Sequence, residues 1–167
     1  MGHIAIQQSV KHDDRDLVQL AGYHAYKRHR KDHELHVNGE IFVVENTKYN
    51  KATGLDALTI KNVTVLNEDG ELSDNRNLDR ELIIVFVGSD QIKEDWIETN
   101  INLIGEAEPA QLVAAKKYFK DVEDDHGAVS SVTGNSLGGA LANTVAIDYP
   151  HVNLVTLNPA MLPGDVI

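Results

Sequence analysis

The residues best suited to chemistry are the five from Gly134 to Gly138, which read Gly-Asn-Ser-Leu-Gly. The pattern Gly-x-Ser-x-Gly is typical of a nucleophile elbow, in which a serine stands at a sharp turn between a strand and a helix. The turn strains the serine backbone, so the residues two before and two after it must be small. The pattern predicts that Ser136 is a nucleophile for acyl transfer. The alternative interpretation is a glycine-rich turn that only packs a helix against a sheet.

The elements on either side of Ser136 come in the order that an elbow requires. Residues 128–133 have a strand-like pattern. Residues 137–148 are rich in small side chains and stop before Tyr149-Pro150, which indicates a helix and its end. The backbone N–H of Leu137 directly follows the serine, where it is the natural first donor to an oxyanion. This context favours the functional interpretation.

Three segments resemble the class 3 lipases, a family with the α/β-hydrolase fold. Residues 134–142 (Gly-Asn-Ser-Leu-Gly-Gly-Ala-Leu-Ala) are similar to that family's elbow. Residues 84–90 (Ile-Val-Phe-Val-Gly-Ser-Asp) and 94–96 (Glu-Asp-Trp) resemble its oxyanion strand and the segment behind it. Residues 155–160 (Val-Thr-Leu-Asn-Pro-Ala) resemble the strand and turn that follow the elbow helix. The resemblance therefore covers about residues 80–165.

The chain departs from the family at two positions, so it would be a distant member. Asn135 stands where the family usually has histidine, and Val87 where it usually has arginine. The resemblance implies a lipase or esterase that cleaves an acyl ester of a lipid-like substrate through a Ser136 acyl-enzyme. It also implies that the backbone N–H of Ser89 is the second oxyanion donor. The other interpretation of Ser89 is a helix cap or a turn residue.

A serine nucleophile needs a histidine base and a carboxylate that orients the base. The only histidine after Ser136 is His151. It precedes the strand expected at residues 152–157, which predicts that it lies at the amino edge of the sheet, far from the serine. The same reasoning places His126 at that edge. Asp165 follows the last strand on the correct side, either as the acid or as a tail residue.

The segment 152–157 would form the last strand of the sheet and expose an apolar edge, which soluble proteins usually protect. Together with the incomplete triad, this predicts a hydrolase truncated after that strand, with its base and acid beyond Ile167. The alternatives are an edge covered by a partner chain or by a second copy, or a degenerate protein that has lost its later part.

The chain as a whole predicts a single domain, residues 1–167, with an α/β-hydrolase-like, mostly parallel sheet and flanking helices. From residue 81 the order strand, helix, strand, helix, strand indicates parallel pairing. Asn38-Gly39 is typical of a hairpin turn. The other predicted elements are helices over 13–30 and 109–124, strands over 41–45, 58–66 and 81–87, and an exposed loop over 67–80.

The composition excludes several classes of partner. With 26 Asp and Glu against 15 Lys and Arg, the formal net charge is −11. This charge argues against nucleic acid as a partner and against simple electrostatic adsorption to anionic membranes. The absence of cysteine excludes disulfides and thiolate chemistry. Neither a signal peptide nor a transmembrane segment is recognisable, so we expect a cytoplasmic protein or one secreted by a leaderless route.

A histidine cluster gives the only metal-like signal, from His24, His29, His33 and His36. His29 and His33 are spaced i, i+4, which can chelate a transition metal on a helix. Lysines and arginines lie between them and disfavour a cation, so no metal or cofactor is expected and a basic, solvated helix end is the preferred interpretation. The same cluster could also supply a base to Ser136 from elsewhere in the fold.

Two functions of different classes follow from these observations. The first is a serine hydrolase of the lipase or esterase type. The second is a catalytically incomplete hydrolase-fold module that acts by binding or assembly through the open edge of residues 152–157. A homo-oligomer that supplies the base in trans is a third option.

Overall fold

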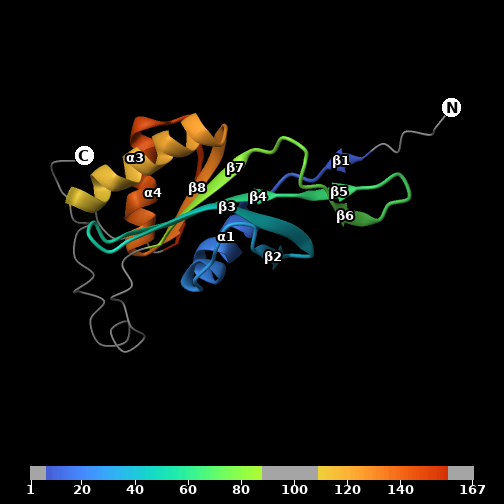
Figure 1. Cartoon of the computed structure of the whole chain (residues 1–167), viewed down its shortest axis with the longest axis horizontal. Helices are drawn as coiled ribbons and strands as arrows, with labels where there is room; N and C mark the ends of the chain where they lie inside the picture. The colour runs from blue at the N-terminus through green and yellow to red at the C-terminus, as the bar shows by residue number, and fades with distance from the viewer. Residues whose placement is uncertain (1–6, 88–108, 158–167) are drawn as a thin grey trace.

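The computed structural model describes residues 7–87 and 109–157, which form a six-stranded sheet covered by helices on both faces (Figure 1). Ser89 and Asp165 lie outside the described residues. The strand order is β2-β3-β4-β7-β8-β9. The bounds are β2 Glu34–Val37, β3 Glu40–Asn50, β4 Leu55–Asn62, β7 Leu82–Val87, β8 Val129–Asn135 and β9 Asn153–Leu157.

The sheet is mixed, so the prediction of a mostly parallel, α/β-hydrolase-like sheet is wrong. Strands β2, β3, β4 and β7 pair antiparallel, and only β7, β8 and β9 are parallel. For the pairs β2–β3 and β3–β4 the reason is connection length, because a short turn can only join antiparallel neighbours. The turn between β2 and β3 is Asn38-Gly39, and both residues have positive φ, as a two-residue hairpin requires.

The parallel half follows from the helices that lie between its strands in the chain. Helix α3 (Pro109–Asp125) comes between β7 and β8, and α4 (Leu137–Asp148) comes between β8 and β9. Both helices pack on one face of the sheet and share a core with alternate β7 residues such as Ile84 and Phe86. The predicted helices over 109–124 and 137–148 are thus confirmed.

Helix α1 (Asp14–Gly22) covers the opposite face, beneath the sheet in Figure 1. Its Leu17, Leu20 and Ala21 pack with Ile83 and Val85, the β7 residues that point away from α3 and α4. A helix is present where the sequence predicts one, but the predicted span of residues 13–30 is too long. The helix stops at Gly22, and a short 3₁₀ helix, η1 (His24–Tyr26), follows.

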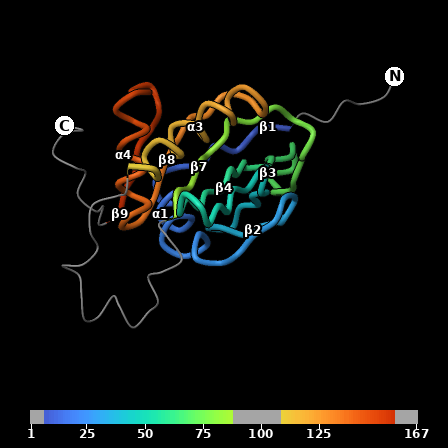
Figure 2. Tube along the Cα trace, turned by 60° about the vertical axis from the view of Figure 1, so that its left-hand side comes forward, coloured from blue at the N-terminus to red at the C-terminus, as the bar shows by residue number. Residues whose placement is uncertain are grey.

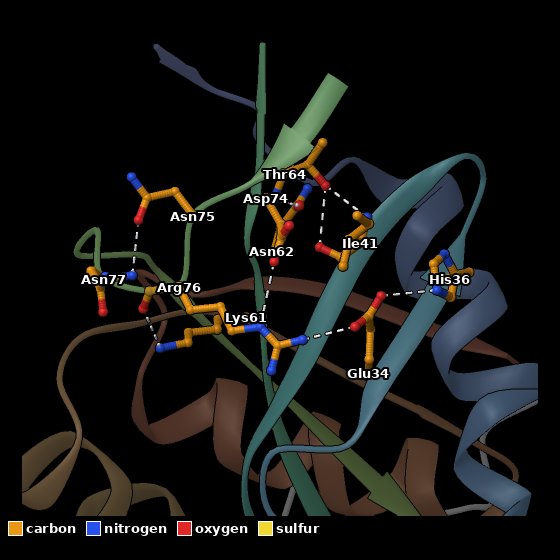
Figure 3. Close-up of polar contacts among 10 residues, drawn as sticks. All are labelled: Glu34, His36, Ile41, Lys61, Asn62, Thr64, Asp74, Asn75, Arg76 and Asn77. Carbon is orange, nitrogen blue, oxygen red and sulfur yellow. Dashed lines mark hydrogen bonds and ion pairs between the residues drawn. The ribbon is translucent and has the colours of Figure 1, made fainter. Parts of the chain in front are cut away.

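A second, three-stranded sheet is built from β1 (Gln8–Ser9), β5 (Thr64–Leu66) and β6 (Leu72–Asp74). The presence of β6 corrects the prediction that residues 67–80 are only a loop. Figure 3 shows how this sheet joins the larger one. The Thr64 hydroxyl accepts from the Ile41 N–H at 2.7 Å and donates to the Ile41 carbonyl at 3.1 Å. Arg76 donates to Glu34 Oε2 at 2.8 Å and lies 3.5 Å from Asp74 Oδ2.

Strand β9 is the edge of the larger sheet within the part of the chain that the structure describes. Its faces are contacted by α1 and α4, and Leu154 remains 37% exposed. None of the described helices is long and apolar enough to cross a membrane.

Candidate active site

Ser136 stands at the junction between β8 and α4 with a strained backbone, φ 55° and ψ −118°. L-residues avoid this region, and such a conformation costs about 1–3 kcal/mol unless the surrounding structure enforces it. Two hydrogen bonds enforce it here. The Ser136 N–H donates to the Leu157 carbonyl of β9 at 2.8 Å, and the Ser136 carbonyl accepts from the Ala140 N–H of α4 at 3.2 Å. The sharp strand-to-helix turn expected from the sequence is therefore present.

The glycines around Ser136 are required by close packing. A Cβ atom on Gly134 would lie 2.2 Å from both the carbonyl carbon and the carbonyl oxygen of Gly138, and 2.7 Å from the Gly139 nitrogen. These are backbone atoms, which cannot move aside as a side chain can. The first turn of α4 thus lies directly against the end of β8, as the glycine spacing predicts.

Helix α4 begins at Leu137, so the Leu137 N–H belongs to the first turn, where backbone donors lack intrahelical acceptors. The positive end of the helix dipole adds to the effect of such donors on a developing negative charge. Leu137 therefore follows Ser136 in the first turn of α4, and its role as an oxyanion donor stays a prediction. The second predicted donor, Ser89, cannot be compared because it lies outside the described residues.

The end of α1 also lies at the Ser136 edge of the sheet. At its start, Asp14 Oδ1 accepts from Asn153 Nδ2 at 3.0 Å, and Asn153 is the first residue of β9. At its end, Gly22 lies against the last residue of β9, since a Cβ there would come within 3.1 Å of Leu157 Cδ1. Helix α1 thus runs alongside β9 and in the same direction (Figure 2). This geometry brings η1 to the carboxyl edge of the parallel strands.

A direct contact confirms that η1 reaches the elbow. Asn135 Nδ2, on the residue before Ser136, donates to the Tyr26 hydroxyl at 2.5 Å. Partial burial raises the pKa of Tyr26 and the Asn135 hydrogen bond opposes that effect, so the phenol keeps its proton. Because its oxygen already accepts from Asn135, the phenol proton is free to point elsewhere at this edge. No sequence pattern identified Tyr26 as a site residue.

The described histidines fall into two groups by their position along the sheet. His151 precedes β9 and His126 precedes β8, which confirms that both lie at the amino edge. His126 Nδ1 also lies 3.7 Å from Glu45 Oε1. His24 lies on η1, at the Ser136 edge. Within residues 7–87 and 109–157, no histidine forms a hydrogen bond with Ser136.

The His24 ring is half-buried and packs edge-on against Tyr23, with 4.9 Å between ring centroids. Burial, and then the nearby Lys27 and His29, lower the pKa of His24 below 6.5. The imidazole is therefore neutral at pH 7, the form that can accept a proton. His29 is less available, because its two ring nitrogens face His33 Nδ1 at 2.8 Å and the His24 carbonyl at 2.6 Å.

The i, i+4 metal interpretation of His29 and His33 loses its basis because α1 ends before both residues. In the described part of the chain, no group of three or more His, Cys, Asp or Glu side chains could hold a metal ion.

A second serine–histidine contact lies at the amino edge, where His12 Nε2 is 2.8 Å from Ser131 Oγ. Ser131 is 1% exposed and therefore cannot meet a substrate. Burial lowers the pKa of His12 despite nearby carboxylates, so this contact joins neutral groups and fixes the N-terminal segment to β8. A groove of about 570 Å³ lies at the same edge, lined in part by Glu45, Lys61 and His126. It is at the opposite end of the strands from Ser136.

Comparison with known proteins adds no relative: no family model, no curated protein and no solved structure matches the chain. The similarity to class 3 lipases therefore stays a prediction from the residues quoted above.

Proposed function

We propose that this protein is a serine hydrolase of the lipase or esterase type that cleaves an acyl ester through an acyl-enzyme on Ser136. The observation that carries the proposal is the strained Ser136 backbone, φ 55° and ψ −118°, held at the first turn of α4. Strain that the surrounding structure must enforce is concentrated at functional sites. A turn that only packed a helix against a sheet would be more stable with glycine at position 136.

In the proposed reaction, Ser136 Oγ attacks the ester carbonyl and transfers its proton to a base. The Leu137 N–H stabilises the oxyanion of the tetrahedral intermediate, and the Ser89 N–H is proposed as the second donor. The alcohol leaves with a proton from the base, and water then hydrolyses the acyl-enzyme. The backbone of the elbow thus supplies orientation and part of the charge stabilisation.

We assign the base to His24. It is the described histidine on η1, and η1 is joined to the elbow through Tyr26 and Asn135. Its pKa lies below 6.5, so it is neutral at pH 7 and can accept the Ser136 proton. Catalytic hydrogen bonds are often long or poorly aligned in unliganded enzymes and tighten only with substrate. The assignment replaces the expectation that the base lies beyond Ile167.

The direct test is labelling with a fluorophosphonate, which reacts with an activated serine and releases fluoride. It does not depend on knowing the ester. We expect the full chain to be labelled and Ser136→Ala to be unlabelled. The matched control is Ser130→Ala on the same strand, which removes only a long hydrogen bond to the Leu82 carbonyl and should be labelled like the parent. Labelling that persists in Ser136→Ala, or no labelling of the parent, contradicts the proposal.

A second candidate function is binding or assembly through β9. The position of β9 at the sheet edge, with Leu154 37% exposed, favours it. This function predicts a stable dimer by light scattering, disrupted by proline at a β9 position, and no fluorophosphonate labelling. A monomer that is labelled supports the hydrolase instead.

A further inference from the structure

The segment of residues 23–31 is the most basic part of an acidic chain. It reads Tyr-His-Ala-Tyr-Lys-Arg-His-Arg-Lys and holds four of the 15 Lys and Arg with no Asp or Glu, although the net charge of the chain is −11. Its four cationic side chains are all exposed: Lys27, Arg28, Arg30 and Lys31. A local positive surface therefore stands against a negative background.

Two aromatic side chains of the 23–31 segment are also exposed, Tyr23 at 54% and Tyr26 at 58%. They are held in place by the cations and by the elbow. Lys27 Nζ lies 4.2 Å from the centre of the Tyr23 ring and donates to its hydroxyl at 2.9 Å. The Tyr26 hydroxyl is bonded to Asn135. Aromatic rings and positive charges thus form one ordered surface.

The position of this surface suggests what it serves. Tyr26 is bonded to the residue directly before Ser136, and Gly22, which precedes the segment, lies against the end of β9. The start of the 23–31 segment is therefore part of the rim around the proposed nucleophile, and its four cations follow directly in the chain. Asp32, the exposed residue directly after Lys31, offsets one of the segment's four positive charges, and Glu34 is already paired with Arg76 and His36.

We propose that the 23–31 segment docks the Ser136 end of the molecule onto an anionic lipid surface. Tyrosine rings have an apolar body and a polar tip, and so favour the boundary between lipid and water. Lysine and arginine near an anionic bilayer each strengthen binding. An anionic bilayer repels the remaining acidic surface, so the molecule approaches the bilayer with the 23–31 segment first. The net charge argues against general adsorption, but a local basic surface gives adsorption in one orientation.

The test measures vesicle binding by co-sedimentation, using the full chain with Ser136→Ala so that no lipid is cleaved. We expect binding to phosphatidylcholine vesicles that contain phosphatidylserine, weakening with added salt, and little binding to phosphatidylcholine alone. Replacing Lys27, Arg30 and Lys31 by glutamine should weaken binding on the order of 100-fold. The matched control replaces Lys116, Lys117 and Lys120 of α3 by glutamine and should bind like the parent.

Several outcomes would overturn the proposal. One is equal weakening by the α3 variant, which would indicate a general charge effect. Another is displacement by inorganic phosphate at constant ionic strength, which would identify a soluble phosphate site. Tyr23→Ser provides a further check, because loss of the Tyr23 ring should weaken vesicle binding even in high salt. Docking requires no hydrolysis, so a labelled protein that fails to bind vesicles would refute docking and leave the proposed function intact.

Discussion

The Tyr26 hydroxyl lies 2.5 Å from Asn135 Nδ2, although 109 residues separate the two in the chain. This hydrogen bond joins the segment after α1 to the residue before the proposed nucleophile. The site therefore combines a turn from the parallel half of the sheet with a 3₁₀ helix from near the N-terminus. The proposed site needs residues from both elements.

Tyr26→Phe should slow the reaction of Ser136 with a fluorophosphonate. The change removes one partly exposed hydrogen bond, which is worth about 1 kcal/mol. We expect a drop of about fivefold in the rate of fluorophosphonate labelling, as that energy implies. Tyr23→Phe is the matched control, because its hydroxyl is bonded to Lys27 instead. An equal loss in both variants would show that the Asn135 contact has no special role.

Gly134→Ala should destabilise the protein by about 3 kcal/mol, since the new methyl group would overlap backbone atoms of Gly138 at 2.2 Å. Urea unfolding of the purified variants measures the change. Gly22→Ala is the comparison, because its methyl group would meet only the movable Leu157 Cδ1 at 3.1 Å. Its free energy of unfolding should stay within about 1 kcal/mol of the parent. Equal effects at both positions would contradict the packing seen at the elbow.

The strain at Ser136 predicts an unusual order of stability. Ser136→Gly should be more stable than Ser136→Ala by about 1 kcal/mol, because glycine adopts φ 55° without steric cost while alanine does not. The gain is reduced by the larger conformational entropy of glycine in the unfolded chain. Thermal and urea unfolding measure the difference in stability between the two variants. An alanine variant as stable as the glycine variant would mean that the backbone at position 136 is not strained.

His24→Gln should lower the labelling rate on the order of 100-fold, the contribution typical of a general base. Because the His24 pKa is lowered below 6.5, the rate in the parent should stay constant from neutral pH upward and fall only in more acidic buffer. His151→Gln is the control, since that residue lies at the opposite edge of the sheet. An unchanged labelling rate in His24→Gln would refute His24 as the base. It would not affect the assignment of Ser136 as the nucleophile.

Glu40→Gln should stabilise the protein in alkaline buffer only. Burial, and then the neighbouring Asp16, raise the pKa of Glu40 from 4.5 to about 7. The protonated carboxyl therefore stabilises the fold fully below pH 4.5, and this stabilisation is lost as the pH rises through about 7. Glutamine stays neutral and can still donate to Asp16.

For this variant we expect a gain of about 1 kcal/mol at about pH 8, less than the full shift would give because solvent screens a half-exposed carboxyl. The gain should vanish in acid. Urea unfolding at both pH values measures this gain in stability. A gain that does not depend on pH would contradict the raised pKa of Glu40 beside Asp16.

Local patterns in the sequence predicted the elements closest to the elbow. The pattern of residues 109–124 indicated α3, and the glycine spacing around Ser136 indicated the turn that the structure shows. Both signals depend on neighbouring residues alone. The direction of strand pairing depends instead on connection length across residues 34–62, and here the expected mostly parallel sheet was wrong.

Contacts between distant residues carried no signal in the sequence. Helix α1 was expected to continue to Arg30, but it ends at Gly22, and η1 then turns toward Asn135. The contact between His12 and Ser131 spans 119 residues and was equally unpredictable. Polar side chains of this kind follow no period that would reveal their partner.

The Ser136 N–H donates to the Leu157 carbonyl, so the backbone of the proposed nucleophile is bonded to the edge strand. Thermodynamic linkage follows from this contact: whatever rigidifies Ser136 also rigidifies β9, and the effect is reciprocal. An adduct on Ser136 should therefore slow amide hydrogen exchange along β9, and a ligand that orders β9 should bind the adduct more tightly than the free protein. The amide proton of Ser136 would then report events at the β9 edge of the sheet.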